Sequence, residues 1–133
     1  MNLLRKTWGI VIAVIISSCH SETIDTISPD GTLKVGVVTT KDGDYGKAAF
    51  VVHYKGDSIF FRSELGLETD AQKFAGNLRL KSVSEPKSVI DDYRMITGKR
   101  SHCVNEASER VYSLENDEGQ TLEVTFRVYN DGI

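Results

Sequence analysis

The chain has 133 residues, which is the usual size of one domain. Its formal net charge is −3 at pH 7. A (β/α)8 barrel needs about 250 residues, and the strand, Gly-rich turn and helix units of a dinucleotide-binding fold are absent, so both of these catalytic architectures are excluded. Hydrophobic residues make up 40%, charged residues 26%, and there are 2 prolines, which excludes low-complexity disorder, collagen and a heptad-rich rod.

The N-terminus has the pattern of an export signal. Arg5 and Lys6 precede the apolar run 8–16, and two serines then lead to Cys19. At about 1.5 Å per residue this run covers only about half of a ~30 Å hydrocarbon core, so a membrane-spanning helix is the weaker interpretation. The residues before Cys19 resemble the lipobox of bacterial lipoproteins, and an ordinary signal peptide with a coincidental cysteine is the alternative. We expect residues 1–18 to be removed and Cys19 to carry a lipid that anchors the exported chain in the periplasm or at the outer membrane.

The mature chain is mildly acidic. Removal of residues 1–18 takes away two positive charges, so the net charge changes from −3 to −5. Nucleic acid is therefore not an expected partner, because binding to a phosphate backbone requires a basic patch. With Cys19 lipidated, Cys103 has no partner for a structural disulfide within the chain, and we interpret it as a packed small hydrophobe rather than a nucleophile.

The first half of the mature chain has the pattern of a tether followed by three strands. Residues 19–26 are polar and are expected to link the anchor to the fold. The expected strands are 32–38, 48–54 and 58–61. The first two of these strands are expected to pair as a hairpin across an Asp-Gly turn. Residues 62–70 contain Gly66 and no regular pattern, and we predict irregular structure there.

The second half of the chain is also predicted to be extended. Residues 78–84 alternate with two leucines facing inward, and residues 87–97 tolerate strand structure. The segments 110–114 and 121–129 flank a turn, and 121–129 has the strongest period of two in the sequence. No stretch of ten or more residues keeps a 3.6-residue apolar period, so the predicted fold class is all-β, with antiparallel strands that form a sandwich.

The possible metal ligands do not have the spacing of a known site. Asp42 could open a calcium loop, but the twelfth position of an EF-hand loop must be Glu and is His53 here. His102 and Cys103 lack a second ligand pair at zinc spacing, and His20 lies far away in the sequence. We therefore predict no metal site in this chain.

Two pairs of acidic residues are of the type that a glycosidase uses, namely Asp91 with Asp92 and Glu106 with Glu109. The two carboxyl groups must lie about 5–5.5 Å apart in a retaining enzyme and about 6.5–9.5 Å apart in an inverting one. Adjacent residues on a strand point to opposite faces, so Asp91 and Asp92 do not meet this requirement. We interpret these acids as solvated surface charge and predict no catalytic residue in the chain.

Tyrosines are the remaining candidates for ligand contact. The sequence has 5 of them, and tyrosines on pleated strands more often serve the core and its edges than a sugar site. If the chain binds glycan, aromatic rings should line one exposed face. Tyr93 and Tyr129 are then the candidate substrate-binding residues.

Two distinctive stretches lie in the last third of the chain. One runs from Asp92 to Cys103, contains Gly-Lys-Arg-Ser, and is followed by Asn-Glu-Ala at 105–107 and by Glu109; the other is Phe-Arg-Val-Tyr-Asn-Asp-Gly at 126–132. Taken together they resemble the N-terminal domain of glycoside hydrolase family 97. The stretches Ile-Ser-Pro-Asp-Gly at 27–31 and Ser-Glu-Leu-Gly-Leu at 63–67 fit the same domain in the same order, so the resemblance covers about residues 27–133.

The resemblance implies a secreted bacterial enzyme that cleaves α-glucosidic or α-galactosidic bonds with the help of calcium in its intact form. In this family an N-terminal β-super-sandwich packs on a (β/α)8 barrel, normally in cis, that carries the catalytic carboxylates, so oligosaccharide or polysaccharide is the implied ligand. The sandwich normally continues beyond the last of these stretches, which implies a partial β-super-sandwich here, truncated before the barrel. No catalytic residue or calcium ligand of the family can be assigned to a position of this chain, and the chain alone is expected to be inactive.

Three other functions stay open. The chain could be a stand-alone lipid-anchored module that binds glycan. It could instead be a structural scaffold that needs a missing half, and the mature chain should then aggregate or show no cooperative melt. A self-sufficient hydrolase would turn over an α-aryl glycoside and lose that activity on replacement of a single carboxylate.

Overall fold

The computed structural model describes residues 24–42, 45–96 and 101–133, and this part of the chain consists of strands and turns without a helix. The strands are β1 (Asp25–Ile27), β2 (Leu33–Asp42), β3 (Tyr45–Tyr54), β4 (Asp57–Leu65), β5 (Leu67–Glu68), β6 (Lys73–Phe74), β7 (Leu78–Val83), β8 (Lys87–Arg94), β9 (His102–Asn116) and β10 (Thr121–Tyr129). The predicted all-β fold with antiparallel strands is confirmed. Among the described residues there is likewise no helix with the length and apolar character needed to cross a membrane.

The pairing of the strands follows their sequence patterns. β2 pairs along its whole length with β3, as the predicted hairpin requires. β3 and β4 are joined by a two-residue turn in which Lys55 and Gly56 both have positive φ, the combination found in type I′ hairpins. β10 has the bounds predicted from its alternation and pairs with β9 in unbroken register. The alternation of apolar residues therefore predicts both bounds of β10. β2 and β3 are longer than the predicted 32–38 and 48–54, because their pairing continues to Asp42 opposite Tyr45.

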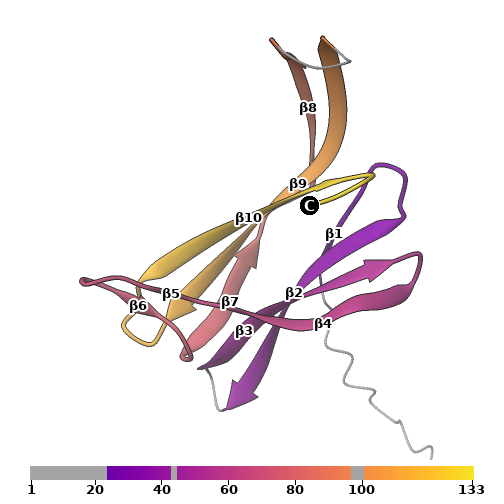
Figure 1. The fold of residues 1–133 in the computed structure, drawn as a ribbon. Helices are drawn as coiled ribbons and strands as arrows, with labels where there is room; N and C mark the ends of the chain where they lie inside the picture. Colours follow the sequence, from indigo (N-terminus) through magenta and orange to yellow (C-terminus); the bar gives the residue numbers. More distant parts are fainter. Residues whose placement is uncertain (1–23, 43–44, 97–100) are drawn as a thin grey trace, which may run out of the picture.

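The main sheet has eight strands and folds back on itself. Its order is β1-β2-β3-β7-β9-β10, with β4 beside β3 and β8 beside β9. β7 meets β3 only at Leu78 opposite Gly46, and it pairs with the end of β9, so it joins one layer to the other. Figure 1 shows the two layers, with β1 and β2 lying near β9 and β10, and these strands are in contact. The arrangement is the sandwich that the sequence predicts.

The core lies between the two layers. Its fully enclosed members come from β2, β3, β7, β9 and β10, and the largest are Tyr112, Leu78, Leu114, Val35, Val52 and Val128. The ring of Tyr112 meets that of Phe126 edge to face at 5.7 Å between centroids. Its hydroxyl donates to the carbonyl of Ile24 at 2.8 Å and lies 2.9 Å from the hydroxyl of Thr26. Burial raises the pKa of the Tyr112 phenol, which keeps it protonated as a donor.

The prediction of irregular structure over residues 62–70 is wrong. β4 continues to Leu65, and β5 follows at once and pairs with β6. The register between β3 and β4 shifts twice, on either side of Val52, which marks β-bulges. Because each bulge reverses which residues face inward, the apolar alternation that reveals a strand is lost in β4.

The ends of three other elements also differ from the expectation. β1 begins at Asp25, so two residues placed in the tether belong to the sheet, and Thr26 is fully buried there. β9 begins at His102 rather than at residue 110, and β8 ends at Arg94. The first half of β9 carries few apolar residues because both of its faces are largely exposed. Its sequence therefore has no apolar alternation from which a strand could be predicted.

Candidate functional site

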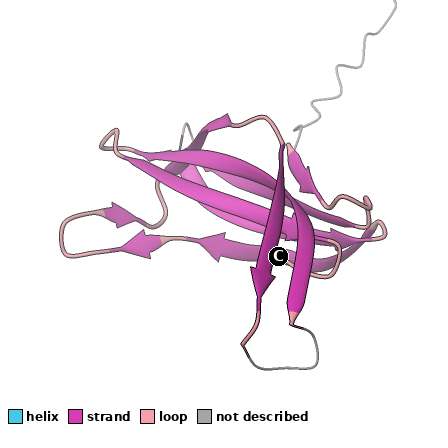
Figure 2. Ribbon diagram, turned by 90° about the horizontal axis from the view of Figure 1, so that it is seen from above, coloured by secondary structure: helices cyan, strands magenta, loops and turns pink. Residues whose placement is uncertain are grey.

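A two-stranded arm projects from the main sheet. It consists of β8 and residues 102–109 of β9, which pair with each other in regular antiparallel register. β10 pairs with β9 only from residue 107 onward, so the outer part of the arm stands clear of the rest of the sheet. Figures 1 and 2 show this extension from two sides, with the C-terminus near its base. The site is built from this arm and the end of β10.

Four polar side chains form a cluster on the outer face of β8, β9 and β10. Arg127 donates from Nε and Nη2 to Glu109 Oε2 at 2.9 and 2.7 Å, and its Nη1 lies 3.4 Å from Asp91 Oδ1. The hydroxyl of Tyr129 donates to Asp91. Phe126 and Val128, which alternate with Arg127 and Tyr129, are buried in the core, so the period of two sends these polar residues outward. We call Asp91, Glu109, Arg127 and Tyr129 the outer-face cluster.

Hydrogen bonds keep the two donors of the outer-face cluster, Arg127 and Tyr129, protonated. The hydrogen bonds to Glu109 raise the pKa of Arg127 above its ordinary value. The hydrogen bond to the Asp91 carboxylate raises the pKa of Tyr129, so the phenol stays protonated and donates. Both carboxylates thereby accept hydrogen bonds from neighbouring side chains, which suits an anchoring role better than proton transfer.

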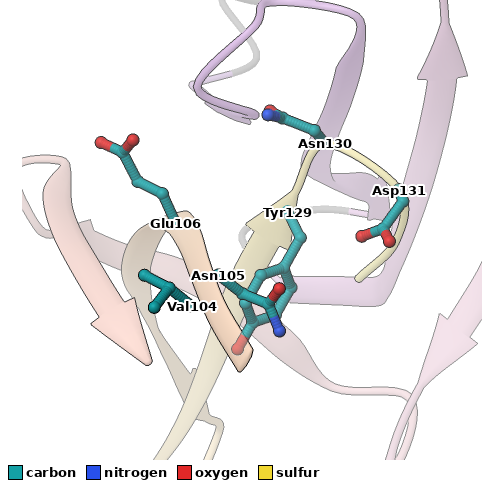
Figure 3. Close-up of a pocket in the computed structure, with 6 residues that line it drawn as sticks. All are labelled: Val104, Asn105, Glu106, Tyr129, Asn130 and Asp131. Carbon is teal, nitrogen blue, oxygen red and sulfur yellow. The ribbon is translucent and has the colours of Figure 1, made fainter. Parts of the chain in front are cut away.

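A hollow of about 260 Å³ lies beside the cluster, between the arm and the turn after β10. It is lined by Val104, Asn105, Glu106, Tyr129, Asn130 and Asp131. In Figure 3 the ring of Tyr129 lies beside the amide of Asn105, whereas the carboxylate of Glu106 points away from it. The turn is held by the Tyr129 N–H, which donates to the Gly132 carbonyl at 2.8 Å, and by the Asp30 N–H, which donates to Asn130 Oδ1 at 3.0 Å.

Both tyrosines predicted as ligand contacts belong to this region. Tyr93 is 46% exposed, and it shares a face of β8 with Asp91, to which Tyr129 is hydrogen-bonded. Tyr129 is half-buried and lines the hollow. The structure thus places the two rings on one face, on either side of Asp91, and their role in binding stays a prediction.

The acid pairs do not have the geometry of a glycosidase. Asp91 belongs to the outer-face cluster, whereas Asp92 Oδ1 lies 2.6 Å from Nε2 of His102 on the opposite face of the arm. Glu106 accepts a hydrogen bond from the Ser88 hydroxyl at 3.3 Å, and Glu109 is bound by Arg127. Each of these carboxylates therefore has a polar partner. The acids were expected to be solvated surface charges, and the structure shows that they are also paired with neighbouring side chains.

The residues of the described ranges do not offer a metal site. In these ranges no three His, Cys, Asp or Glu side chains are grouped so that they could hold a metal ion. The calcium that the resemblance implies for an intact enzyme thus has no ligand set in the described part. Cys103 is a free, partly buried cysteine on the arm. His20, Cys19 and part of the Asp-Gly-Asp stretch that begins at Asp42 lie outside the described residues.

Sequence reasoning missed Arg127 and Asn105. Each faces an acidic residue in the strand register, Arg127 opposite Glu109 and Asn105 opposite Asp91. The alternation of residues 121–129 already indicated that Arg127 points outward. Which residue of the neighbouring strand it would meet depends on the register between strands, which a single-strand pattern does not contain.

A family model and solved structures match this chain. The model described as Glycosyl-hydrolase 97 N-terminal matches residues 27–133. A crystal structure of a β-arabinopyranosidase is 30% identical, with a TM-score of 0.71 over 80% of this chain and 16% of that one. A glycoside hydrolase family 97 enzyme from Pseudoalteromonas sp. strain K8 is 19% identical, with TM-scores of 0.67 in complex with acarbose and 0.65 for a variant with panose, over the same two shares. At 19% identity the likeness to the Pseudoalteromonas enzyme concerns the fold alone.

This chain is thus much shorter than the solved proteins it matches, since it spans 16% of the length of each. A search among curated proteins gave no match.

Proposed function

Because this chain belongs to the glycosyl-hydrolase 97 family, of which it carries the N-terminal domain, we propose that it serves an enzyme that hydrolyses α-glycosides. The chain is the non-catalytic β-sandwich part of such an enzyme, and its task is to hold carbohydrate and to support the catalytic part. The observation that carries this proposal is the family match over residues 27–133.

The chemistry of the described side chains supports a non-catalytic role. A glycosidase needs one carboxyl group that is protonated and one that is free to attack or to activate water. In this chain the acids of the arm are bound by Arg127, Tyr129, His102 and Ser88. The reactive carboxylates would then come from a barrel in cis. The match covers only 16% of the length of the solved relatives, so most of each relative lies outside the matched region.

The outer face of the arm is suited to contact sugar. A sugar ring presents an apolar C–H face and a rim of hydroxyl groups, so it is recognised by aromatic rings next to hydrogen-bonding side chains. Tyr93 supplies an exposed ring, and Asp91, Asn105 and Arg127 supply donors and acceptors on the same face. The panose and acarbose complexes of the Pseudoalteromonas enzyme support carbohydrate as the ligand class.

We expect a Tyr93→Ala substitution to weaken carbohydrate binding about tenfold, which corresponds to about 1.4 kcal/mol. The measurement is a titration of the full ¹⁵N-labelled chain with panose, followed by NMR shifts and by calorimetry. Tyr54→Ala is the matched control, because Tyr54 is 42% exposed but lies at the end of β3 beneath the Lys55 ammonium. Equal losses in both variants, or shifts that avoid the arm, would reject the proposed contact surface.

We also propose that the chain is exported and that Cys19 carries its lipid anchor. The support is the charged, apolar and small-residue pattern of residues 1–19, which lies outside the described residues. In cells grown with an alkyne-labelled fatty acid, the full chain should take up the label and sediment with membranes, and Cys19→Ala should lose both. Cys103→Ala should keep both, and label retained by Cys19→Ala would contradict the anchor.

A further inference from the structure

The strand β4 carries apolar side chains that are exposed to solvent. Ile59, Phe60 and Phe61 are 53%, 59% and 81% exposed. Tyr54, at the end of the preceding strand, is 42% exposed. β4 pairs with β3 on one side, and on its other side no strand of the described ranges pairs with it. We call Tyr54 and residues 59–61 the β4 patch. An exposed apolar patch marks a contact with another protein or with a membrane.

A β-bulge places Phe61 on the outer face of its layer. The register of β4 against β3 shifts next to Val52, so that Phe61 and Arg62 together lie opposite the single residue Val51. Val51 points away from the core, because its neighbour Val52 is buried in the core. Bulges also protect an edge strand from pairing with another chain. The side chains of β4, rather than its backbone, are therefore suited to make the contact.

The charged residues near the β4 patch are of the kind found where a protein meets lipid headgroups. Aromatic rings and long basic side chains are enriched there, because the ring or the aliphatic stem enters the apolar region while the charge stays in water. Arg62 ends the apolar run, and Lys55 Nζ lies 5.1 Å from the centre of the Tyr54 ring. Both cations are exposed and would meet the negative charge of anionic lipids. The acids of β4 stand towards its ends, and Glu64 is ion-paired with Lys47 at 2.9 Å.

The proposed lipid anchor lies within reach of the same surface. Asp25, at the start of β1, is paired with Gly36, which is paired with Val51. The bulge opposite Val51 is therefore three strand spacings, or about 14 Å, away from Asp25. Cys19 precedes Asp25 by six residues, which span at most about 20 Å. A membrane that holds the lipid of Cys19 can thus also touch the β4 patch.

We propose that the β4 patch rests on the phospholipid surface of the membrane that holds the lipid of Cys19. The aromatic side chains enter the headgroup boundary, and Lys55 and Arg62 face the lipid phosphates. An anchor on a tether fixes where the domain is, and a second contact also fixes how the domain is turned. The arm projects away from β4 in Figure 1, so this orientation keeps the candidate carbohydrate surface clear of the membrane. The inference rests on the proposed anchor and goes beyond the proposed role in glycoside hydrolysis.

The test places a single tryptophan in the β4 patch. Trp8 is the one tryptophan of the sequence and lies in the segment expected to be removed, so the expected mature chain has none. The full sequence with Phe61→Trp is expressed in cells, and the membrane-bound protein is reconstituted in vesicles of phosphatidylethanolamine and phosphatidylglycerol. We expect bromine on the upper acyl chains to quench at least about half of the fluorescence, because an interfacial side chain lies about 5–10 Å deep.

Ile96→Trp is the matched control for Phe61→Trp. Ile96 is fully exposed and lies two residues past the end of β8 on the arm, so bromine should not quench a tryptophan there. Equal quenching in the two variants would overturn the inference, as would a Phe61→Trp fluorescence that bromine leaves unchanged. A Phe61→Trp spectrum that shifts with protein concentration in detergent, without quenching in vesicles, would assign the patch to a second copy instead.

The unaltered protein separates failure of this inference from failure of the anchor. Fluorescence from Trp8 in the membrane-bound unaltered protein would show that residues 1–18 are retained, which rejects the anchor and this inference with it. A lipid on Cys19 together with unquenched Phe61→Trp fluorescence rejects this inference alone. Neither result changes the expected binding of panose, because the candidate carbohydrate surface lies on the arm.

Discussion

Replacement of Tyr112 by alanine is expected to lower the free energy of unfolding by about 3–5 kcal/mol, as for other large aromatic-to-alanine changes in a core. Tyr112 is fully buried, and its ring packs edge to face on Phe126. The substitution opens a cavity between the two layers and removes the hydroxyl that binds Ile24 and Thr26. The measurement is urea-induced unfolding followed by circular dichroism of the backbone.

Two further variants separate the ring of Tyr112 from its hydroxyl. Tyr112→Phe keeps the ring and leaves the Ile24 carbonyl and the Thr26 hydroxyl without their partner, so a loss of about 1–2 kcal/mol is expected. Thr26→Val removes one partner only and should cost less than Tyr112→Phe. A Tyr112→Phe loss as large as that of Tyr112→Ala would show that packing of the ring contributes little.

Leu78→Ala is expected to lower the free energy of unfolding by about 2–5 kcal/mol. Leu78 is fully buried and lies opposite both Gly46 of β3 and Asn116 of β9. It therefore stands where β7 joins the two layers, and a cavity there loosens both. The same urea titration measures the effect.

Leu80→Ala is the matched control for Leu78→Ala. Leu80 is two residues along the same strand and on the same face, but it is only partly buried at the margin of the core. Its loss should be clearly smaller, because part of the side chain is already in water and the site can collapse more easily. Equal losses of unfolding free energy would mean that the junction made by β7 contributes no more to stability than the margin of the core does.

The sequence predicts the regular half of this fold well. β10 could be predicted to the residue because Leu122, Val124, Phe126 and Val128 alternate with polar residues and all contact the core. β2 and β3 follow from the same pattern and an intervening turn. The period of two is strong wherever one face is buried and the other is wet.

β4 and the arm could not be predicted in this way. β4 carries two bulges, so Phe60 and Phe61 fall out of the alternation and are 59% and 81% exposed. The arm has two largely exposed faces, so its composition does not repeat with any period. Such elements are positioned by the strands they pair with, which the local sequence does not reveal.

The sequence predicted the two tyrosines of the candidate site, Tyr93 and Tyr129. It did not predict their polar neighbours Arg127 and Asn105. Of the residues that carry the family resemblance, Asn105 and Glu106 on the arm and residues 129–131 at the end of β10 line the hollow, whereas the stretch that begins at Asp92 contributes to the arm alone. The sequence placed Tyr93 and Tyr129 on one exposed face only on the condition that the chain binds glycan. It could not predict that Asp91 connects them, because that contact depends on the register of three strands.

We propose that this chain supports glycoside hydrolysis by an intact enzyme and does not hydrolyse glycosides itself. The most direct test is to incubate the purified full chain with the 4-nitrophenyl α-glycosides of glucose and galactose and to follow nitrophenol release. We expect no release above the spontaneous rate. Release that disappears on a single carboxylate replacement, such as Asp91→Asn or Glu109→Gln, would contradict the claim.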